Sequence, residues 1–186
     1  TSLLANIQSK SFFYPSVGLS FIITEFLKVP KSILTFSKLR LSYATVGNVP
    51  LYLAGITIPS YPISPGGGVN INPDLPINNL KFEKTKSFEI GLNSRFLNNK
   101  IGFDITYYNA NTYDQLFKFR APENSGYRYF YVNAGKVNNY GIEASLDADL
   151  SFGEFNYSPM LTFTYNKNKI VELVRNIPNP LTGKLM

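Results

Sequence analysis

The sequence predicts an all-β fold, namely a segment of a large antiparallel transmembrane β-barrel. Six runs of residues alternate apolar and polar side chains with the period of two that is typical of β-strands. Charged residues make up 16% of the 186-residue chain, against about 25% in ordinary soluble domains, although 15 Phe and 13 Tyr are present. A strand in a membrane barrel carries lipid-facing and lumen-facing side chains in turn, which accounts for this balance.

The first three runs each separate a large apolar face from a small or polar one. Residues 13–24 place Val, Leu and Phe opposite Gly, Ser and Thr, with Ile22 as the exception. Residues 39–44 alternate Leu and Tyr with Arg, Ser and Ala, and residues 88–96 alternate Phe, Ile and Leu with Glu, Asn and Arg. Such runs predict strands with one face against lipid and the other against a wet lumen.

The last three runs repeat this pattern. Residues 101–107 alternate Ile, Phe and Tyr with Gly, Asp and Thr. Residues 140–150 set Tyr, Ile, Ala and Leu against Gly, Glu, Ser and Asp, and residues 155–166 set Phe, Tyr and Leu against Asn, Ser and Thr. The six strands are therefore expected to share one architecture, with apolar and polar faces throughout.

The connections between the runs alternate in length. We expect short turns at 98–100 and 151–154, and long loops at 47–85 and 119–135. The connection at 25–36 is intermediate and has room for one short helical turn. Short turns at one end and long loops at the other are typical of the periplasmic turns and extracellular loops of outer-membrane barrels.

The number of strands indicates a fragment. Single-chain membrane barrels have at least about eight strands. Six strands alone would leave two open edges in lipid, where unpaired backbone groups are not tolerated. We therefore interpret residues 1–186 as part of a barrel domain that pairs with strands elsewhere in a longer polypeptide.

The composition excludes most enzyme chemistry. The chain has no Cys and no His, which removes cysteine nucleophiles, the commonest general base and the commonest transition-metal ligand. Glu143, Asp147 and Asp149 share one strand face, as glycosidase carboxylates can. We interpret them instead as an acidic stripe in a wet lumen, balanced by Lys or Arg on neighbouring strands. The glycines at 66–68 lack the Lys-Ser/Thr of a phosphate loop.

We accordingly predict that the protein is not an enzyme and has no catalytic, cofactor-binding or metal-binding residue. We also expect no nucleic-acid partner. The net charge of +6 is spread thinly along the chain, and the aromatic residues lie on the face assigned to lipid rather than among the basic residues.

Aromatic residues in the long loops are the candidate contact residues. The loop at 119–135 carries Tyr127, Arg128, Tyr129 and Tyr131 in close succession, and the loop at 47–85 carries Tyr52 and Tyr61. Aromatic faces stack on sugar rings, and Arg adds directed hydrogen-bond donors. We therefore predict substrate or lid contact at these six residues. The alternative is an aromatic cluster that stiffens the loop or an aromatic belt near the membrane interface.

Six phrases of the sequence, in order, resemble the SusC/RagA-type TonB-dependent outer-membrane transporters. They are YPSVGLS at 14–20, LRLSYATVGN at 39–48, LKFEKTKSFEIGL at 80–92, DITYYN and TYDQL at 104–116, NAGKVNNYGIE at 133–143, and FTYNKNKIVEL at 163–173. Each phrase alone is weak evidence, but the ordered series covers most of residues 11–173. The resemblance places the segment in the C-terminal part of the barrel.

The resemblance implies a parent barrel of about 22 strands with a plugged lumen in the bacterial outer membrane of a Bacteroidetes-type organism. It implies TonB-dependent active import of oligosaccharides or peptides, acting with a SusD-like surface lipoprotein in the lipid bilayer. The plug and the TonB-contacting part lie outside this segment, so energy coupling rests on the resemblance alone. The alternatives are a passive or structural outer-membrane β-barrel and a soluble all-β carbohydrate-binding module.

Overall fold

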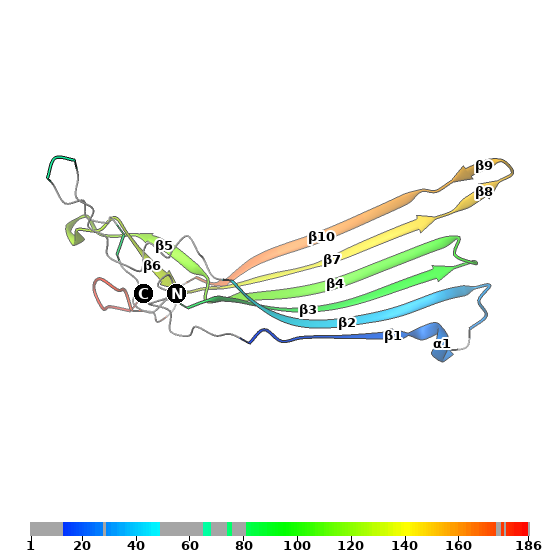
Figure 1. Cartoon of the computed structure of the whole chain (residues 1–186), viewed down its shortest axis with the longest axis horizontal. Coiled ribbons are helices and arrows are strands. Elements are labelled where there is room, and N and C mark those ends of the chain that lie inside the picture. Colours follow the sequence, from blue (N-terminus) through cyan, green and yellow to red (C-terminus); the bar gives the residue numbers. More distant parts are fainter. Residues whose placement is uncertain are drawn as a thin grey trace.

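The computed structural model describes residues 13–27, 29–48, 65–67, 74–75, 81–173, 176 and 178–185. Its main feature is one six-stranded antiparallel sheet with the order β1-β2-β3-β4-β7-β10. The strands of this sheet are β1 (Ser16–Ile22), β2 (Leu34–Asn48), β3 (Glu83–Phe96), β4 (Ile101–Tyr113), β7 (Lys136–Ala148) and β10 (Met160–Glu172). The sheet is long, gently curved and open at both edges (Figure 1). Each alternating run of the sequence lies in or overlaps one of these strands, which confirms the predicted antiparallel all-β fold.

Short connections join the strands at one end, which we call the turn end. Helix α1 (Ile23–Leu27) follows β1, and residues 97–100 link β3 to β4. In that link Leu97, Asn98 and Asn99 have φ of 52°, 54° and 69°. Asn tolerates this left-handed conformation, because its short polar side chain can bond the local backbone. The short turn expected at 98–100 is found here, whereas of the turn expected at 151–154 only residues 153–154 form a turn.

A small second hairpin extends the turn end beyond the main sheet. Its strands are β8 (Leu150–Phe152) and β9 (Phe155–Tyr157). The turn between them contains Gly153 at φ 65°, a conformation that glycine adopts without steric cost.

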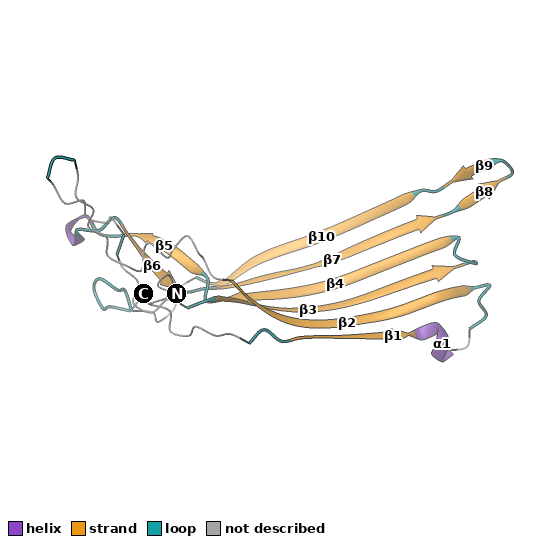
Figure 2. Cartoon of the chain, viewed as in Figure 1, coloured by secondary structure: helices purple, strands orange, loops and turns teal. Residues whose placement is uncertain are grey.

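The opposite end, which we call the loop end, carries a hairpin of its own. Strands β5 (Leu116–Arg120) and β6 (Tyr129–Asn133) flank the short 3-10 helix η3 (Glu123–Ser125), and the hairpin projects from the main sheet (Figure 2). The region 119–135, expected as a loop, is thus an ordered hairpin. Phe119 stacks on Phe130 with ring centroids 5.5 Å apart. A buried cluster of Ala121, Phe130, Val132 and Ala134 holds the hairpin together.

The main sheet has two chemically distinct faces, and the register shows them directly. One row of partners across all six strands reads Leu19, Leu41, Ile90, Tyr107, Ile142 and Tyr165. The neighbouring row, on the other face, reads Ser20, Arg40, Gly91, Thr106, Glu143 and Thr164. The apolar and polar faces that period-two alternation predicted are therefore continuous across the sheet.

The apolar face of the sheet is not a protein core. Leu19 is 67% exposed and Phe163 61% exposed. The buried apolar side chains of the described chain lie at the loop end, in and beside the β5–β6 hairpin. Among the described residues, no helix is long and apolar enough to span a membrane. A sheet that leaves such large side chains uncovered needs an apolar surrounding, as the wall of a membrane barrel has.

Candidate functional site: the polar face of the sheet and the loop-end hairpin

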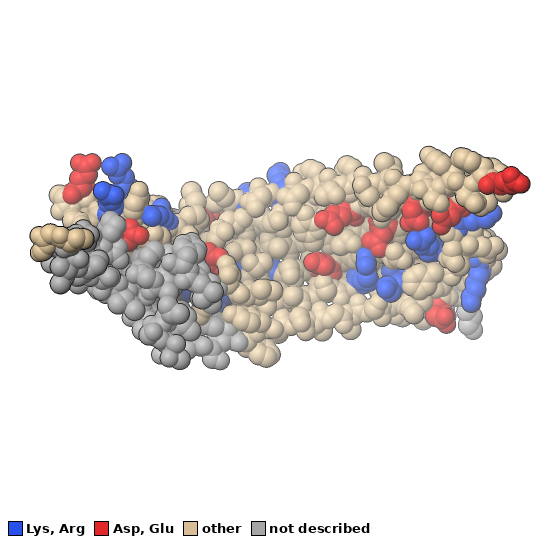
Figure 3. All heavy atoms as spheres, turned by 45° about the horizontal axis from the view of Figure 1, so that its top comes forward, with Lys and Arg blue, Asp and Glu red and all other residues tan. Residues whose placement is uncertain are grey.

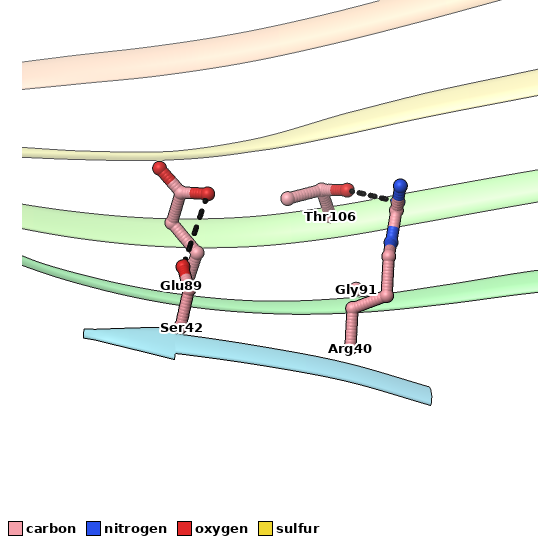
Figure 4. Close-up of a pocket in the computed structure, with 5 residues that line it drawn as sticks. All are labelled: Arg40, Ser42, Glu89, Gly91 and Thr106. Atoms are coloured by element: carbon pink, nitrogen blue, oxygen red, sulfur yellow. Dashed lines mark hydrogen bonds between the residues drawn. The ribbon is translucent and has the colours of Figure 1, made fainter. Parts of the chain in front are cut away.

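The polar face is built from side chains that cross a whole strand. Arg40 on β2 reaches over β3 to Asp104 on β4, with Nη2 donating to Oδ1 at 2.9 Å and to Oδ2 at 3.1 Å. The same nitrogen donates to Oγ1 of Thr106 at 3.3 Å. The strand that is crossed has Gly91 at this point, and a Cβ atom there would lie 2.9 Å from Nη2 of Arg40. The glycine therefore leaves the space through which the guanidinium passes (Figure 4).

A second bridge has the same construction. Arg95 on β3, Gly102 on β4 and Asp147 on β7 are partners in one row. Nη1 of Arg95 donates to Oδ2 of Asp147 at 2.7 Å, and a Cβ atom at residue 102 would collide with the carboxylate of Asp147. The prediction that basic residues on neighbouring strands balance the acidic stripe is confirmed for this residue.

A third bridge joins neutral groups. Tyr108 on β4, Gly141 on β7 and Asn166 on β10 share a row, and Nδ2 of Asn166 donates to the Tyr108 hydroxyl at 2.6 Å. The three bridges tie strands β2 to β4, β3 to β7, and β4 to β10. The two ion pairs are partly exposed, so each contributes only about 0–1 kcal/mol to stability. Their main effect is to order the polar wall.

The hollow in Figure 4 lies beside the first bridge. Arg40 and Thr106 face each other across Gly91, and Glu89 accepts a hydrogen bond from Ser42 at 3.5 Å. Acidic and basic side chains gather over the half of this face nearer the turn end (Figure 3). The hollow is open, and its polar side chains are hydrogen-bonded to one another. Such a surface suits contact with another polar molecule better than it suits catalysis.

In the part of the chain that the structure describes, no group of three or more His, Cys, Asp or Glu residues could hold a metal ion. Each of the two ion pairs on the polar face joins strands on either side of a third strand, which has a glycine at the point of crossing. What the arrangement can do chemically is present hydrogen-bonding groups to a wet lumen.

Two of the predicted contact residues, Tyr129 and Tyr131, converge on Lys118 of β5. The Lys118 ammonium lies 3.9 Å from the ring centroid of Tyr129 and 5.4 Å from that of Tyr131. The Tyr131 hydroxyl donates to Oδ2 of Asp74 at 3.0 Å, and Lys118 Nζ lies 4.0 Å from the same oxygen. The cluster therefore ties the hairpin to the segment that contains Asp74.

Two side chains of this cluster, Lys118 and Tyr131, have raised pKa values. The side chain of Tyr131 raises the pKa of Lys118 above its ordinary value. Burial raises the pKa of the Tyr131 phenol. Tyr131 is also largely buried, so its ring supports the hairpin more than it offers a free surface.

The other predicted contact residues fall elsewhere. Tyr127 and Arg128 lie near the hairpin tip, where they line an open hollow with Arg120 and Glu123. Arg128 is exposed and Tyr127 half-buried, while Tyr129 of the Lys118 cluster is also exposed. Tyr52 and Tyr61 lie outside the described residues.

Sequence reasoning missed the residues that hold the hairpin. Asn133 donates to the main-chain oxygens of Lys81 and Asp114, both at 2.9 Å, and accepts from Lys81 N at 2.8 Å. Oε1 of Glu83 accepts from Leu116 N at 3.0 Å. The alternation in the sequence LFKFR at 116–120 was a signal for β5. The long-range partners left no local signal.

The chain matches a known family over almost its whole length. The family described as TonB dependent receptor-like, beta-barrel matches residues 3–184. TonB-dependent receptor P3 of Formosa agariphila is 31% identical over 174 residues, which is 89% of this chain and 17% of the relative. TonB-dependent receptor SusC of Bacteroides thetaiotaomicron is 30% identical over 173 residues, or 86% of this chain and 17% of the relative.

Solved structures agree in fold. The structure of the RagAB peptide transporter superposes with a TM-score of 0.75 at 26% identity, covering 86% of this chain and 18% of that chain. The 'open-open' state of the RagAB peptide importer gives a TM-score of 0.76 at 26% identity, covering 95% of this chain and 20% of that chain. The chain spans about a fifth of the length of the relatives it matches.

Proposed function

Because the chain belongs to the TonB-dependent receptor β-barrel family, of the SusC/RagA type, we propose that it forms part of the wall of an outer-membrane importer. The importer takes up oligosaccharides or peptides, draws energy through TonB and acts with a SusD-like surface lipoprotein. The chain contributes wall and loops and performs no bond chemistry. Relatives named SusC and RagAB peptide transporter support this proposal.

The observation that carries the proposal is the two-faced register of the main sheet. One face exposes rows of large apolar side chains, and the other holds charges that pair across glycines. Lipid suits the first face and a water-filled lumen the second. A soluble carbohydrate-binding module would have to leave the first face in water, where surfaces of this size are costly.

The loop-end hairpin is the proposed contact with substrate or lipoprotein. It lies at the end of the sheet where the long connections are, and Tyr127 and Arg128 line the open hollow near its tip. A tyrosine ring supplies a stacking surface for a sugar or peptide, and arginine supplies directed donors. Tyr131 and Lys118, which pair in the middle of the hairpin, tie it to Asp74.

The test uses the full-length receptor in cells, with the double variant Tyr127→Ala/Arg128→Ala. We expect reduced uptake or weaker lipoprotein co-purification while the barrel still assembles. The matched control is Tyr157→Ala, which removes an exposed tyrosine at the turn end. Unchanged uptake together with unchanged co-purification would contradict the role of the hairpin tip. Uptake that persists without TonB would contradict active import.

A further inference from the structure

The apolar face of the sheet changes character toward the loop end. Toward that end, every strand from β2 to β10 carries an aromatic side chain on this face: Tyr43, Phe88, Tyr107, Tyr140 and Tyr165. Beyond them the same parity carries mainly polar side chains. The next complete row reads Thr45, Lys86, Asn111, Asn138 and Lys169. An aromatic girdle followed by a polar zone marks the height at which lipid headgroups meet a barrel.

Lysines dominate this polar zone. Four lysines lie on the same face of the sheet as the aromatic girdle: Lys86 on β3, Lys136 on β7, and Lys167 and Lys169 on β10. We call these four the lysine belt. Lys86, Lys167 and Lys169 are exposed and Lys136 is half-buried. Within the described ranges, none of the four forms an ion pair.

Other charged side chains on this face do not cancel the belt. Lys84 follows the same parity on β3, two positions from Lys86. Glu172 lies opposite Lys136 where a bulge shifts the register of β10. The zone therefore remains positively charged, and it faces away from the lumen.

Two belt ammonium groups converge on one ring. Nζ of Lys86 lies 5.9 Å from the ring centroid of Tyr113, and Nζ of Lys136 lies 5.1 Å from it. On the adjacent edge of the same zone, Lys167 and Lys169 stand two residues apart on one face of β10. The four lysines thus lie in one area of this face, across β3, β7 and β10.

That area contains a cluster of three amides. Nδ2 of Asn138 donates to Oδ1 of Asn109 at 2.7 Å and to Oδ1 of Asn111 at 3.1 Å. Nδ2 of Asn111 also donates to Oδ1 of Asn109 at 3.1 Å. The mutual hydrogen bonds fix the amides in place, while their remaining donor and acceptor positions suit sugar hydroxyl groups.

We propose that the lysine belt binds the phosphate groups of a phosphorylated glycolipid in the leaflet at the loop end. Ammonium groups without an acidic partner at headgroup height attract phosphate. The amide cluster and Tyr113 favour a sugar headgroup over a plain phospholipid, because they offer hydrogen bonds and an aromatic face beside the charges. The inference goes beyond import, and it rests on the membrane placement of the sheet given above.

The experiment measures lipid binding to the delipidated full-length receptor by native mass spectrometry. The probes are a diphosphorylated lipid A, the same glycolipid without phosphates, and phosphatidylglycerol. Lys86→Gln/Lys136→Gln removes half of the belt, and a second variant replaces the two belt lysines of β10 by Gln. The matched control is Lys38→Gln/Lys100→Gln, which removes two charges from the lumen side and the turn end. Heat-dependent gel mobility verifies that each variant folds. If one belt variant fails to fold, the other is used alone for the test.

A lysine near an anionic membrane surface contributes about a fivefold gain in affinity, so each belt variant is expected to weaken binding of the diphosphorylated probe by about 25-fold. The control should bind as the wild type does. Wild-type affinity in both belt variants would overturn the proposal, as would equal binding of the phosphate-free glycolipid. Equal binding of phosphatidylglycerol would overturn the glycolipid assignment. A receptor that binds the lipid but imports nothing would refute the proposed function alone.

Discussion

Gly141 offers the sharpest test of the strand-crossing bridges. A Cβ atom at this position would collide with the main-chain oxygen of Tyr165, and it would lie 2.6 Å from Oη and 2.7 Å from Cζ of Tyr108. The end of the tyrosine side chain can move away. The oxygen of Tyr165 cannot, because it belongs to the strand that pairs with β7. Gly141→Ala must therefore separate β7 from β10 locally.

The expected cost follows from these contacts. Overpacking of this kind costs about 1–3 kcal/mol, and loss of the 2.6 Å bond between Tyr108 and Asn166 adds about 1 kcal/mol. Alanine restricts the unfolded chain and returns about 0.4–1 kcal/mol. With these three contributions combined, the free energy of unfolding should fall by about 1–4 kcal/mol.

The assay is urea denaturation of the folded full-length receptor, followed by the heat-dependent gel mobility of the barrel. The matched control is Gly18→Ala, because the nearest atom to a Cβ there, the oxygen of Leu41, is 3.9 Å away. We expect the control to be as stable as the wild type. Equal midpoints for Gly141→Ala and Gly18→Ala would refute the close approach on which the bridges depend.

Two further predictions concern single groups. Gly102→Ala should displace the carboxylate of Asp147 and break its 2.7 Å ion pair with Arg95. A double-mutant cycle should therefore show that Arg95→Gln costs up to about 1 kcal/mol in the wild-type background and nothing in the Gly102→Ala background. The pKa of Tyr131 is raised, so the fold favours the neutral phenol; the resulting stabilisation is present below the ordinary pKa of about 10 and is lost as pH rises through the higher folded pKa. Absorbance titration of the wild type against Tyr131→Phe should therefore show one phenol ionising later than the exposed tyrosines, and an ordinary titration of that phenol would contradict its burial.

The strands and their faces were predictable because their signal is local. Alternation along residues 88–96 already assigns Ile90 to the apolar face and Glu89 to the polar one, whatever the neighbouring strands are. The register then places Ile90 beside Leu41 and Tyr107, as two-faced strands require. A shift of one residue would turn every apolar side chain toward the lumen, so the pattern itself restricts the register.

The hairpin at the loop end was only partly predictable. The aromatic residues at 127–131 indicated a functional or stiffened loop, and the structure brings Tyr129 and Tyr131 together on Lys118. The stiffening, however, also involves Asp74, which is 57 residues from its partner Tyr131. A contact of that separation leaves no trace in a local pattern, so the sequence showed the aromatic residues without showing what orders them.

The glycines of the polar face show where period-two analysis stops. Such analysis treats Gly91, Gly102 and Gly141 alike, as small residues on the polar parity. In the sheet, each is crossed by a polar side chain from a neighbouring strand that reaches a partner beyond it. The requirement for glycine therefore arises from residues on two other strands, and it becomes visible only once the register joins all three. Each bridge therefore sets two conditions. The side chain that crosses must be long enough to span one strand, and the residue that it crosses must lack a Cβ atom. Arginine and tyrosine meet the first condition, and only glycine meets the second.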